Sequence, residues 1–198
     1  MATVCRLCPR ECGIDRSVKA GRCGVSNQIK LARVGLHNWE EPCLSYGAGS
    51  GTVFFSGCVL GCVFCQNHAI SRGKKGYGVS VQTLADEFLR LQEMGAVNIN
   101  LVTPTQFTDK IRLSLDIAKP HLSIPVVYNC GGYEKPETLR TLDGYVDIFL
   151  PDFKYYSKEA AAKYSAAADY FDMASAALEE MYKLVGYARF DESGHMTR

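Results

Sequence analysis

Cysteine is the residue that most constrains how this chain can fold. The 198 residues include nine cysteines, and all of these except Cys43 and Cys130 fall in two tight clusters. The number is odd, and Met1–Arg10 lacks the apolar core of an export signal, so we do not expect a disulfide framework. In a reducing compartment, short cysteine spacings are typical of metal sites. The pattern therefore predicts a cytoplasmic metal-binding protein.

The composition fits an ordinary globular protein of one domain, or of one domain with a small appendage. Hydrophobic residues make up 47% and charged residues 22% of the chain, close to the average for globular domains. The formal net charge of +1 gives no electrostatic basis for binding nucleic acid or an anionic membrane. No apolar stretch approaches the roughly 20 residues that span a bilayer. We expect neither nucleic acid nor a membrane as a partner.

From residue 51 onward, short β-branched or aromatic runs alternate with helical patterns. Ser80 is a suitable N-cap for the first helix, in which apolar residues recur with the spacing of one helical face. Pro120, Pro136 and Gly144 bound the later helices. The predicted strands are 52–55, 97–102, 124–128 and 146–150; the predicted helices are 80–95, one around 111–118, 136–144, and 157–185 with a break near Asp169.

The four strand–helix repeats predict an α/β fold with parallel strands and right-handed crossovers. We expect a partial (β/α) barrel, shortened to about four units, over residues 51–198, preceded by a cysteine-rich metal-binding segment over residues 1–50. That segment has little periodic apolar pattern, so a metal or packing on the larger domain must order it. A doubly wound open sheet is the alternative, and the absence of a GxGxxG motif after the first strand weakens it.

The second cysteine cluster directly follows the first predicted strand. Cys58, Cys62 and Cys65 have the spacing C-x3-C-x2-C, and α/β barrels build their active sites at this end of the strands. Three thiolates can each bind one iron of a four-iron cluster and leave the fourth iron open. The alternative is a zinc site completed by His68 or Cys43, although zinc spacing usually pairs one C-x2-C unit with a second.

This triplet, with the aromatic Phe64 before its third cysteine, resembles the signature of the radical S-adenosylmethionine (SAM) enzymes. The string Cys5-Arg6-Leu7-Cys8-Pro9-Arg10-Glu11-Cys12-Gly13 is similar to the branch of pyruvate formate-lyase-activating-enzyme-like proteins. The resemblance implies a [4Fe–4S] cluster that reductively cleaves SAM to methionine and a 5′-deoxyadenosyl radical, which abstracts a hydrogen atom from a substrate. It also implies an electron donor such as flavodoxin or ferredoxin, and a protein substrate such as a glycyl radical enzyme. Barrels of this class usually have six units, so four units imply a shortened copy or a lost C-terminus.

Contacts to SAM are expected at the ends of the strands. By resemblance, Phe64 lies near the adenine, and Lys154 meets the ribose or carboxylate while Asp152 orients it or binds a monovalent cation. The string Thr103-Pro104-Thr105 stands where the superfamily often has a Gly-Gly-Glu motif, and its two hydroxyls can accept from the methionine ammonium. Asn129 offers an amide to the ribose or carboxylate. Each position also has a purely structural interpretation, as a core aromatic, a loop cap or a surface ion pair.

The N-terminal cluster has the spacing C-x2-C-x3-C-x10-C. Its members Cys5, Cys8, Cys12 and Cys23 match a closed four-thiolate site, which holds either zinc or a second iron–sulfur cluster. Spacing does not choose between the two. A structural role is favoured because this segment lacks a core of its own.

Three classes of function remain open at this point. The first is a radical SAM enzyme, which includes an activase that makes a glycyl radical on a protein partner. The second is an iron–sulfur electron-transfer protein that does not cleave SAM, and the third is a zinc-stabilised interaction protein with an inactive, truncated barrel. An open iron distinguishes the first class from the second, and the metal content distinguishes the third class from both.

Overall fold

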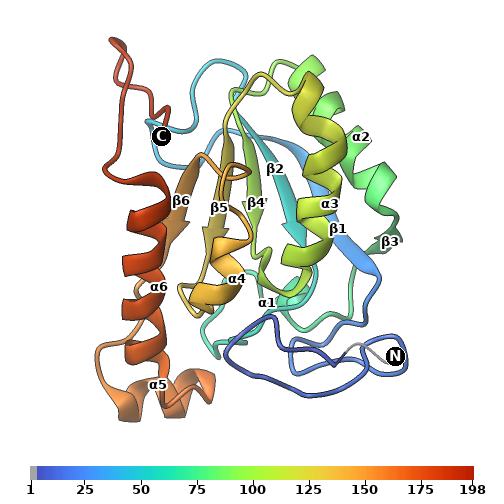
Figure 1. Cartoon of the computed structure of the whole chain (residues 1–198), viewed down its shortest axis with the longest axis vertical. Helices are drawn as coiled ribbons and strands as arrows, with labels where there is room; N and C mark the ends of the chain where they lie inside the picture. The colour runs from blue at the N-terminus through green and yellow to red at the C-terminus, as the bar shows by residue number, and fades with distance from the viewer. Residues whose placement is uncertain (1–3) are drawn as a thin grey trace.

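A six-stranded sheet forms the centre of the protein, which we describe from a computed structural model covering residues 4–198. The strand order is β3-β1-β2-β4-β5-β6, and Figure 1 shows the strands side by side. Strands β2, β4, β5 and β6 run parallel, whereas β1 pairs antiparallel with both β2 and β3. The strands are β1 (Ile29–His37), β2 (Ser50–Phe55), β3 (Tyr77–Val79), β4 (Ile99–Val102), β5 (Val126–Cys130) and β6 (Ile148–Pro151).

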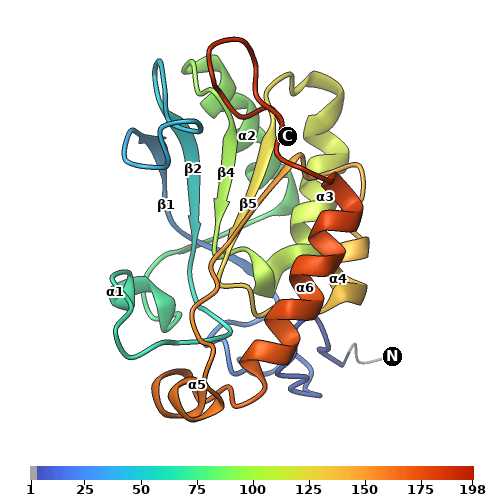
Figure 2. The same ribbon diagram turned by 90° about the vertical axis from the view of Figure 1, so that its left-hand side faces the viewer.

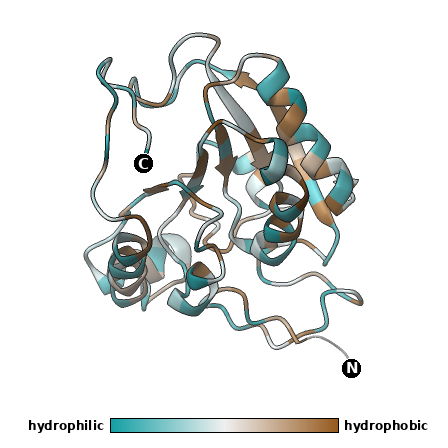
Figure 3. Cartoon of the chain, turned by 45° about the horizontal axis from the view of Figure 1, so that its top comes forward, coloured by the Kyte–Doolittle hydropathy of each residue, from teal (hydrophilic) through white to brown (hydrophobic). Residues whose placement is uncertain are grey.

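The longer helices cover one face of this sheet (Figures 1 and 2). Helix α2 packs on α3, and α4 packs on α6. The helices are α1 (His68–Ser71), α2 (Val81–Glu93), α3 (Thr108–Ala118), α4 (Pro136–Arg140), α5 (Lys158–Ser165) and α6 (Tyr170–Val185), with short 3-10 helices at Thr105–Phe107 and Lys119–His121. Figure 3 shows hydrophobic residues concentrated on the strands and on the helix sides that face them. None of the helices described here combines the length and apolar character needed to cross a membrane.

The alternating sequence pattern predicted the parallel part of the fold, and the structure confirms it. In α2 the Ser80 hydroxyl accepts from the Thr83 N–H at 3.0 Å, and the helix buries Leu84, Phe88 and Leu91 completely. This cap satisfies one of the free N–H groups of the first turn. The expected break in the last helical region is also present, because Ala166 adopts a left-handed φ of 49° after α5.

Two strands were not predicted, and both lie at the antiparallel edge of the sheet. Strand β1 belongs to the segment 1–50, which we expected to contain only a metal-binding motif. Its sequence IKLARVGLH buries Ile29 and Leu31, but Arg33 is exposed and the other residues are half-buried. The alternation of apolar and polar residues is therefore weak in this strand. Strand β3 has only three residues, too few to produce any pattern.

The N-terminal segment that precedes β1, residues 4–28, packs at the carboxyl end of the parallel strands. In Figures 1 and 2 it runs beneath the sheet, on the side to which the arrow of β2 points and where α1 and α5 lie. Backbone contacts fix this position: the Cys58 N–H donates to the Cys23 carbonyl at 3.1 Å, and the Thr138 hydroxyl donates to the Leu7 carbonyl at 2.8 Å. The two cysteine clusters are therefore neighbours in space.

Candidate metal centre and cofactor site

The loop after β2, residues 56–67, carries the C-x3-C-x2-C triplet, and we call it the cluster loop. It leaves the sheet through Ser56, whose hydroxyl donates to the Lys75 carbonyl at 2.5 Å, and through Gly57. Gly57 has φ 86°, and an added Cβ would lie 2.6 Å from the Cys23 carbonyl oxygen. Only glycine accommodates both this backbone conformation and this close approach. The cluster loop is therefore held tightly against the N-terminal segment.

All three thiols of the triplet are free and lie in this short loop. Cys62 is buried, whereas Cys58 and Cys65 are half-buried. Burial raises the pKa of the Cys58 thiol, while backbone N–H groups of Gly61 and Leu60 oppose this rise because they donate to its sulfur. Such N–H donors stabilise a thiolate, the form that binds metal. Within residues 4–198, no three His, Cys, Asp or Glu side chains converge on one point as metal ligands.

A hydroxyl pair covers the buried thiol of the triplet. The Ser165 hydroxyl, at the end of α5, donates to the Cys62 sulfur at 2.9 Å and bonds the Tyr155 hydroxyl at 2.6 Å. Sequence reasoning missed both residues, because Ser165 and Cys62 are 103 positions apart and no local motif joins them. Hydrogen bonds to a ligating sulfur are one means by which a protein tunes a metal centre.

Arg10 ties the N-terminal cysteine motif to the same region. Its Nε donates to the Val59 carbonyl at 2.9 Å, and its Nη2 donates to the Ser165 carbonyl at 2.8 Å. The guanidinium also lies over the ring of Tyr133, 5.0 Å from the ring centroid. One side chain thus joins the N-terminal segment, the cluster loop and the end of α5.

The residues expected to contact SAM through the cluster loop and β4 lie in different environments. Phe64 is 59% exposed beside the loop and makes edge contacts with Tyr155 and Tyr164. Thr103 is half-buried at the end of β4 with a left-handed φ of 58°, a strained conformation for a β-branched residue. The Thr105 hydroxyl instead points into the protein, where it donates to Glu134 at 2.5 Å. Of the two threonines, Thr103 is the one left available to a ligand.

The residues expected at the ends of β5 and β6 lie close together. Gly131 stands between the cluster loop and Lys154, because an added Cβ would lie 2.8 Å from Leu60 Cδ1 and 3.6 Å from Lys154 Cε. Lys154 forms an ion pair with Asp152. The Asn129 amide reaches towards Glu40, with 3.5 Å between Nδ2 and Oε2. A small ligand laid across these strand ends would therefore meet an amide, an ammonium and a carboxylate.

Comparison with known proteins decides which family has this site. A model of the radical SAM superfamily matches residues 52–187, a stretch that includes the cluster loop and the ends of β4, β5 and β6. The chain belongs to the radical SAM superfamily. It is also 27% identical over 175 residues to the uncharacterized protein MJ0674 of Methanocaldococcus jannaschii, an alignment that covers 85% of this chain and 51% of that protein. The chain therefore spans about half the length of this curated relative.

The superfamily implies a [4Fe–4S] cluster and SAM, and the residues present fit both groups. Three soft sulfur ligands in one loop are a suitable set for an iron–sulfur cluster, and backbone N–H groups donate to one of them, the Cys58 sulfur. The glycine at 131 leaves room between the cluster loop and Lys154, where any larger residue would meet Leu60. The cluster loop thus offers three thiols, and the neighbouring strand ends offer an amide, an ammonium and a carboxylate.

Tyr170 of α6 is a further residue of this site that sequence reasoning missed. Its hydroxyl donates to the Gly131 carbonyl at 2.8 Å, with the Asp152 carbonyl at 3.0 Å as an alternative acceptor, and accepts from the Lys154 N–H at 2.8 Å. These bonds join the ends of β5 and β6 and fix the backbone of Lys154. The signal in the sequence is a tyrosine in an apolar helix, which is indistinguishable from a core aromatic.

We expect Tyr170→Phe to lower the free energy of unfolding by about 1 kcal/mol, because it leaves partly buried backbone groups without their hydroxyl partner. Urea unfolding, followed by circular dichroism, measures this change. Tyr182→Phe removes a hydroxyl from a half-exposed tyrosine of the same helix and is the matched control. Equal stability of the two variants would contradict the role given to the Tyr170 hydroxyl.

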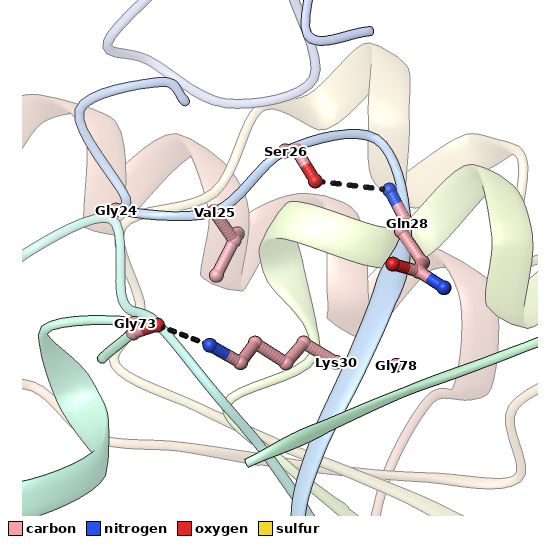
Figure 4. Close-up of a pocket in the computed structure, with 7 residues that line it drawn as sticks. All are labelled: Gly24, Val25, Ser26, Gln28, Lys30, Gly73 and Gly78. Carbon is pink, nitrogen blue, oxygen red and sulfur yellow. Dashed lines mark hydrogen bonds between the residues drawn. The ribbon is translucent and has the colours of Figure 1, made fainter. Parts of the chain in front are cut away.

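One pocket of about 270 Å³ lies beside the cluster loop but outside the radical SAM site (Figure 4). It is lined mainly by glycines and by the start of β1, including Gly24, Gly73, Gly78 and Lys30. The ammonium of Lys30 already donates to the Gly73 carbonyl at 2.7 Å. Because its one cation is engaged, this pocket is a weaker candidate for a charged ligand than the strand ends.

Proposed function

We propose that this protein reductively cleaves SAM and uses the resulting radical to abstract a hydrogen atom from a substrate. The observation that carries the proposal is the presence of Cys58, Cys62 and Cys65 in one loop at the carboxyl end of β2, within the region that matches the superfamily. With three local thiolates, one iron keeps an open position. When bound, the reduced cluster supplies the electron that splits the SAM sulfonium into methionine and a 5′-deoxyadenosyl radical.

In this scheme, the residues of the chain bind and orient SAM and shield the cluster sulfur from water. Lys154, held by Asp152, would bind the carboxylate or ribose of SAM, and the Asn129 amide would bond the same part of the cofactor. Thr103 would accept from the methionine ammonium, and Phe64 would pack on the adenine. The Ser165 hydroxyl, bonded to Tyr155, donates to the Cys62 sulfur, and burial of this thiol would limit its contact with water. Exclusion of water lowers the local dielectric and protects reactive intermediates from side reactions.

The substrate that we favour is a glycine of a protein partner, as in activating enzymes. An aromatic surface next to the cluster loop supports a macromolecular substrate, because exposed apolar patches mark interaction sites. Phe64 contacts Tyr155, Tyr155 contacts Tyr170, and Tyr170 in turn contacts Phe153. The exposed members of this surface are Val63, Phe64, Phe153, Tyr156, Tyr164 and Phe171. The reductant that we propose is a small electron carrier such as flavodoxin or ferredoxin.

Anaerobic reconstitution tests the proposal. The full chain is supplied with iron and sulfide, reduced with dithionite and mixed with SAM, and 5′-deoxyadenosine and methionine are measured by chromatography. We expect both products in equal amounts. A protein that carries a complete cluster but releases neither product would be an electron-transfer protein, and the proposal would then be wrong.

We expect Lys154→Met to weaken SAM binding about tenfold, the effect of losing one charge-assisted hydrogen bond, while the iron content stays the same. Lys158→Met, a change of the same type at an exposed residue of α5, should leave the SAM affinity unchanged. Equilibrium dialysis with labelled SAM measures both variants. Identical affinity in the two variants would remove Lys154 from the cofactor site.

A further inference from the structure

The four N-terminal cysteines lie in two backbone turns that face each other. In the first turn, Cys5 pairs with the opposite side of a small hairpin. Its N–H donates to the Ile14 carbonyl at 2.9 Å, and its carbonyl accepts from the Gly13 N–H at 3.1 Å. The Glu11 N–H closes a tight turn on the Cys8 carbonyl at 3.0 Å. Cys23 lies in the second turn, which the Gly24 N–H closes on the Gly21 carbonyl at 2.9 Å.

These turns bring two of the four sulfurs, those of Cys12 and Cys23, to one small space. An added Cβ at Gly21 would lie 3.5 Å from the Cys23 sulfur and 3.7 Å from the Cys12 sulfur, so these two sulfurs flank the same small space. Burial raises the pKa of the Cys8 and Cys23 thiols, and nearby cysteines add to the rise: Cys23 and Cys12 for Cys8, and Cys5 and Cys12 for Cys23. Cys8 and Cys23 are buried, whereas Cys5 and Cys12 are half-buried.

A buried arginine next to these thiols provides an independent indication of a ligand. Arg16 is only 6% exposed, and it donates to two carbonyls, those of Gln106 at 2.6 Å and Ser26 at 2.7 Å. Its Nε has no hydrogen-bond partner, and within residues 4–198 no carboxylate pairs with its guanidinium. Burying a cation without an anion is unfavourable. Burial raises the pKa of the Cys23 thiol, and the positive charge of Arg16 opposes this rise, so the guanidinium lies near this sulfur.

We propose that Cys5, Cys8, Cys12 and Cys23 hold one zinc ion, as a closed structural centre distinct from the cluster loop. Binding of Zn²⁺ by four thiols releases four protons to solvent and leaves a centre of net charge −2, which Arg16 partly neutralises. Four thiolates leave no open coordination position, so the centre is structural and takes no part in SAM cleavage. The segment that carries these cysteines has no core of its own, and zinc supplies the missing stability.

The proposed zinc centre would stabilise the cluster loop through hydrogen bonds to its backbone. The Cys23 carbonyl accepts from the Cys58 N–H, and Arg10, which lies between Cys8 and Cys12 in the chain, holds the Val59 carbonyl. Loss of the zinc therefore loosens the cluster loop at its first cysteine. The proposed iron and zinc sites share contacts but no ligand, so their metal contents can be separated by mutation.

Metal analysis of the full chain, purified without added iron or zinc, tests the proposal. We expect about one zinc per chain in the wild type, in Cys58→Ser and in the control Cys43→Ser, and none in Cys12→Ser. Zinc that is absent from the wild type, retained in Cys12→Ser or lost in Cys58→Ser would overturn the proposal. So would extra iron and sulfide that disappear in Cys12→Ser, because they would identify a second iron–sulfur cluster.

If Cys12→Ser does not fold, X-ray absorption at the zinc edge of the wild-type protein still tests the proposal. We expect a zinc edge with four sulfur ligands at about 2.3 Å. A ligand shell that contains nitrogen or oxygen would contradict a centre made of these four cysteines. Neither measurement depends on SAM cleavage, so its outcome is independent of the proposed function.

Discussion

The Cys58→Ser variant is expected to lose its iron–sulfur cluster and with it the cleavage of SAM. A serine hydroxyl is a poor ligand for iron, and two remaining thiolates do not hold the cluster. Changes to groups that only orient a metal ligand typically cost 10–100-fold, so loss of a ligand should lower 5′-deoxyadenosine release by at least about 100-fold. Iron and sulfide counts, together with chromatography of the products, measure both effects.

Cys43→Ser is the matched control for this variant. Cys43 is a half-buried free thiol outside both cysteine clusters, and its loss should leave iron content and SAM cleavage at wild-type values. The comparison also tests whether Cys43 completes the ligand set of Cys58, Cys62 and Cys65. Equal iron loss in the two variants would make Cys43 a fourth cluster ligand and contradict the three-ligand account.

The largest pH effect is expected from Glu134, a fully buried carboxyl in the loop after β5. Burial raises its pKa from 4.5 to about 8, although hydrogen bonds from Thr105, Tyr128 and Cys130 oppose the rise. The folded protein therefore binds a proton that the unfolded chain has lost between these two pH values. The free energy of unfolding must then fall as pH rises from about 4.5 to 8, and the fall is at most about 5 kcal/mol.

Glu134→Gln should abolish this slope, because glutamine does not titrate and resembles the protonated acid in shape. The other groups facing Glu134 are the Tyr128 hydroxyl and the thiols of Cys130 and Cys8. They are present in both proteins, so their titration cancels in the comparison. Glu137→Gln changes an exposed carboxyl nearby and should keep the wild-type slope. Urea unfolding between pH 5 and 9 measures all three proteins, and parallel curves for the wild type and Glu134→Gln would disprove the assignment.

The parallel half of the fold could be predicted because its periodic signals are strong and local. Apolar residues at 84, 88 and 91 indicated α2, and Ser80 indicated where it begins. The antiparallel strand β1 could not be predicted, because only one face of it is well buried and Arg33 interrupts the pattern. The pairing of β1 with β2 and β3 is tertiary information, and the local periodicity of the sequence does not contain it.

The candidate site also has a part that the sequence predicts and a part that it does not. The position of the cysteine triplet after the first parallel strand followed from the spacing and the strand order. Thr105 was expected at the cofactor, but its hydroxyl turns inward to Glu134, since a residue in a short 3-10 turn can face either side. Tyr170 and Ser165 act from helices far along the chain, and their roles depend on tertiary packing that a single sequence does not reveal.

Electron paramagnetic resonance of the reduced, anaerobically reconstituted protein tests the open iron most directly. The spectrum is recorded before and after addition of SAM, with Cys12→Ser as a second sample to separate any signal from the N-terminal cysteines. If three cysteines hold the cluster, SAM binds the fourth iron and its addition must shift the signal. A strong cluster signal that SAM leaves unchanged would mean that the polypeptide ligates every iron, and the enzymatic account would then be wrong.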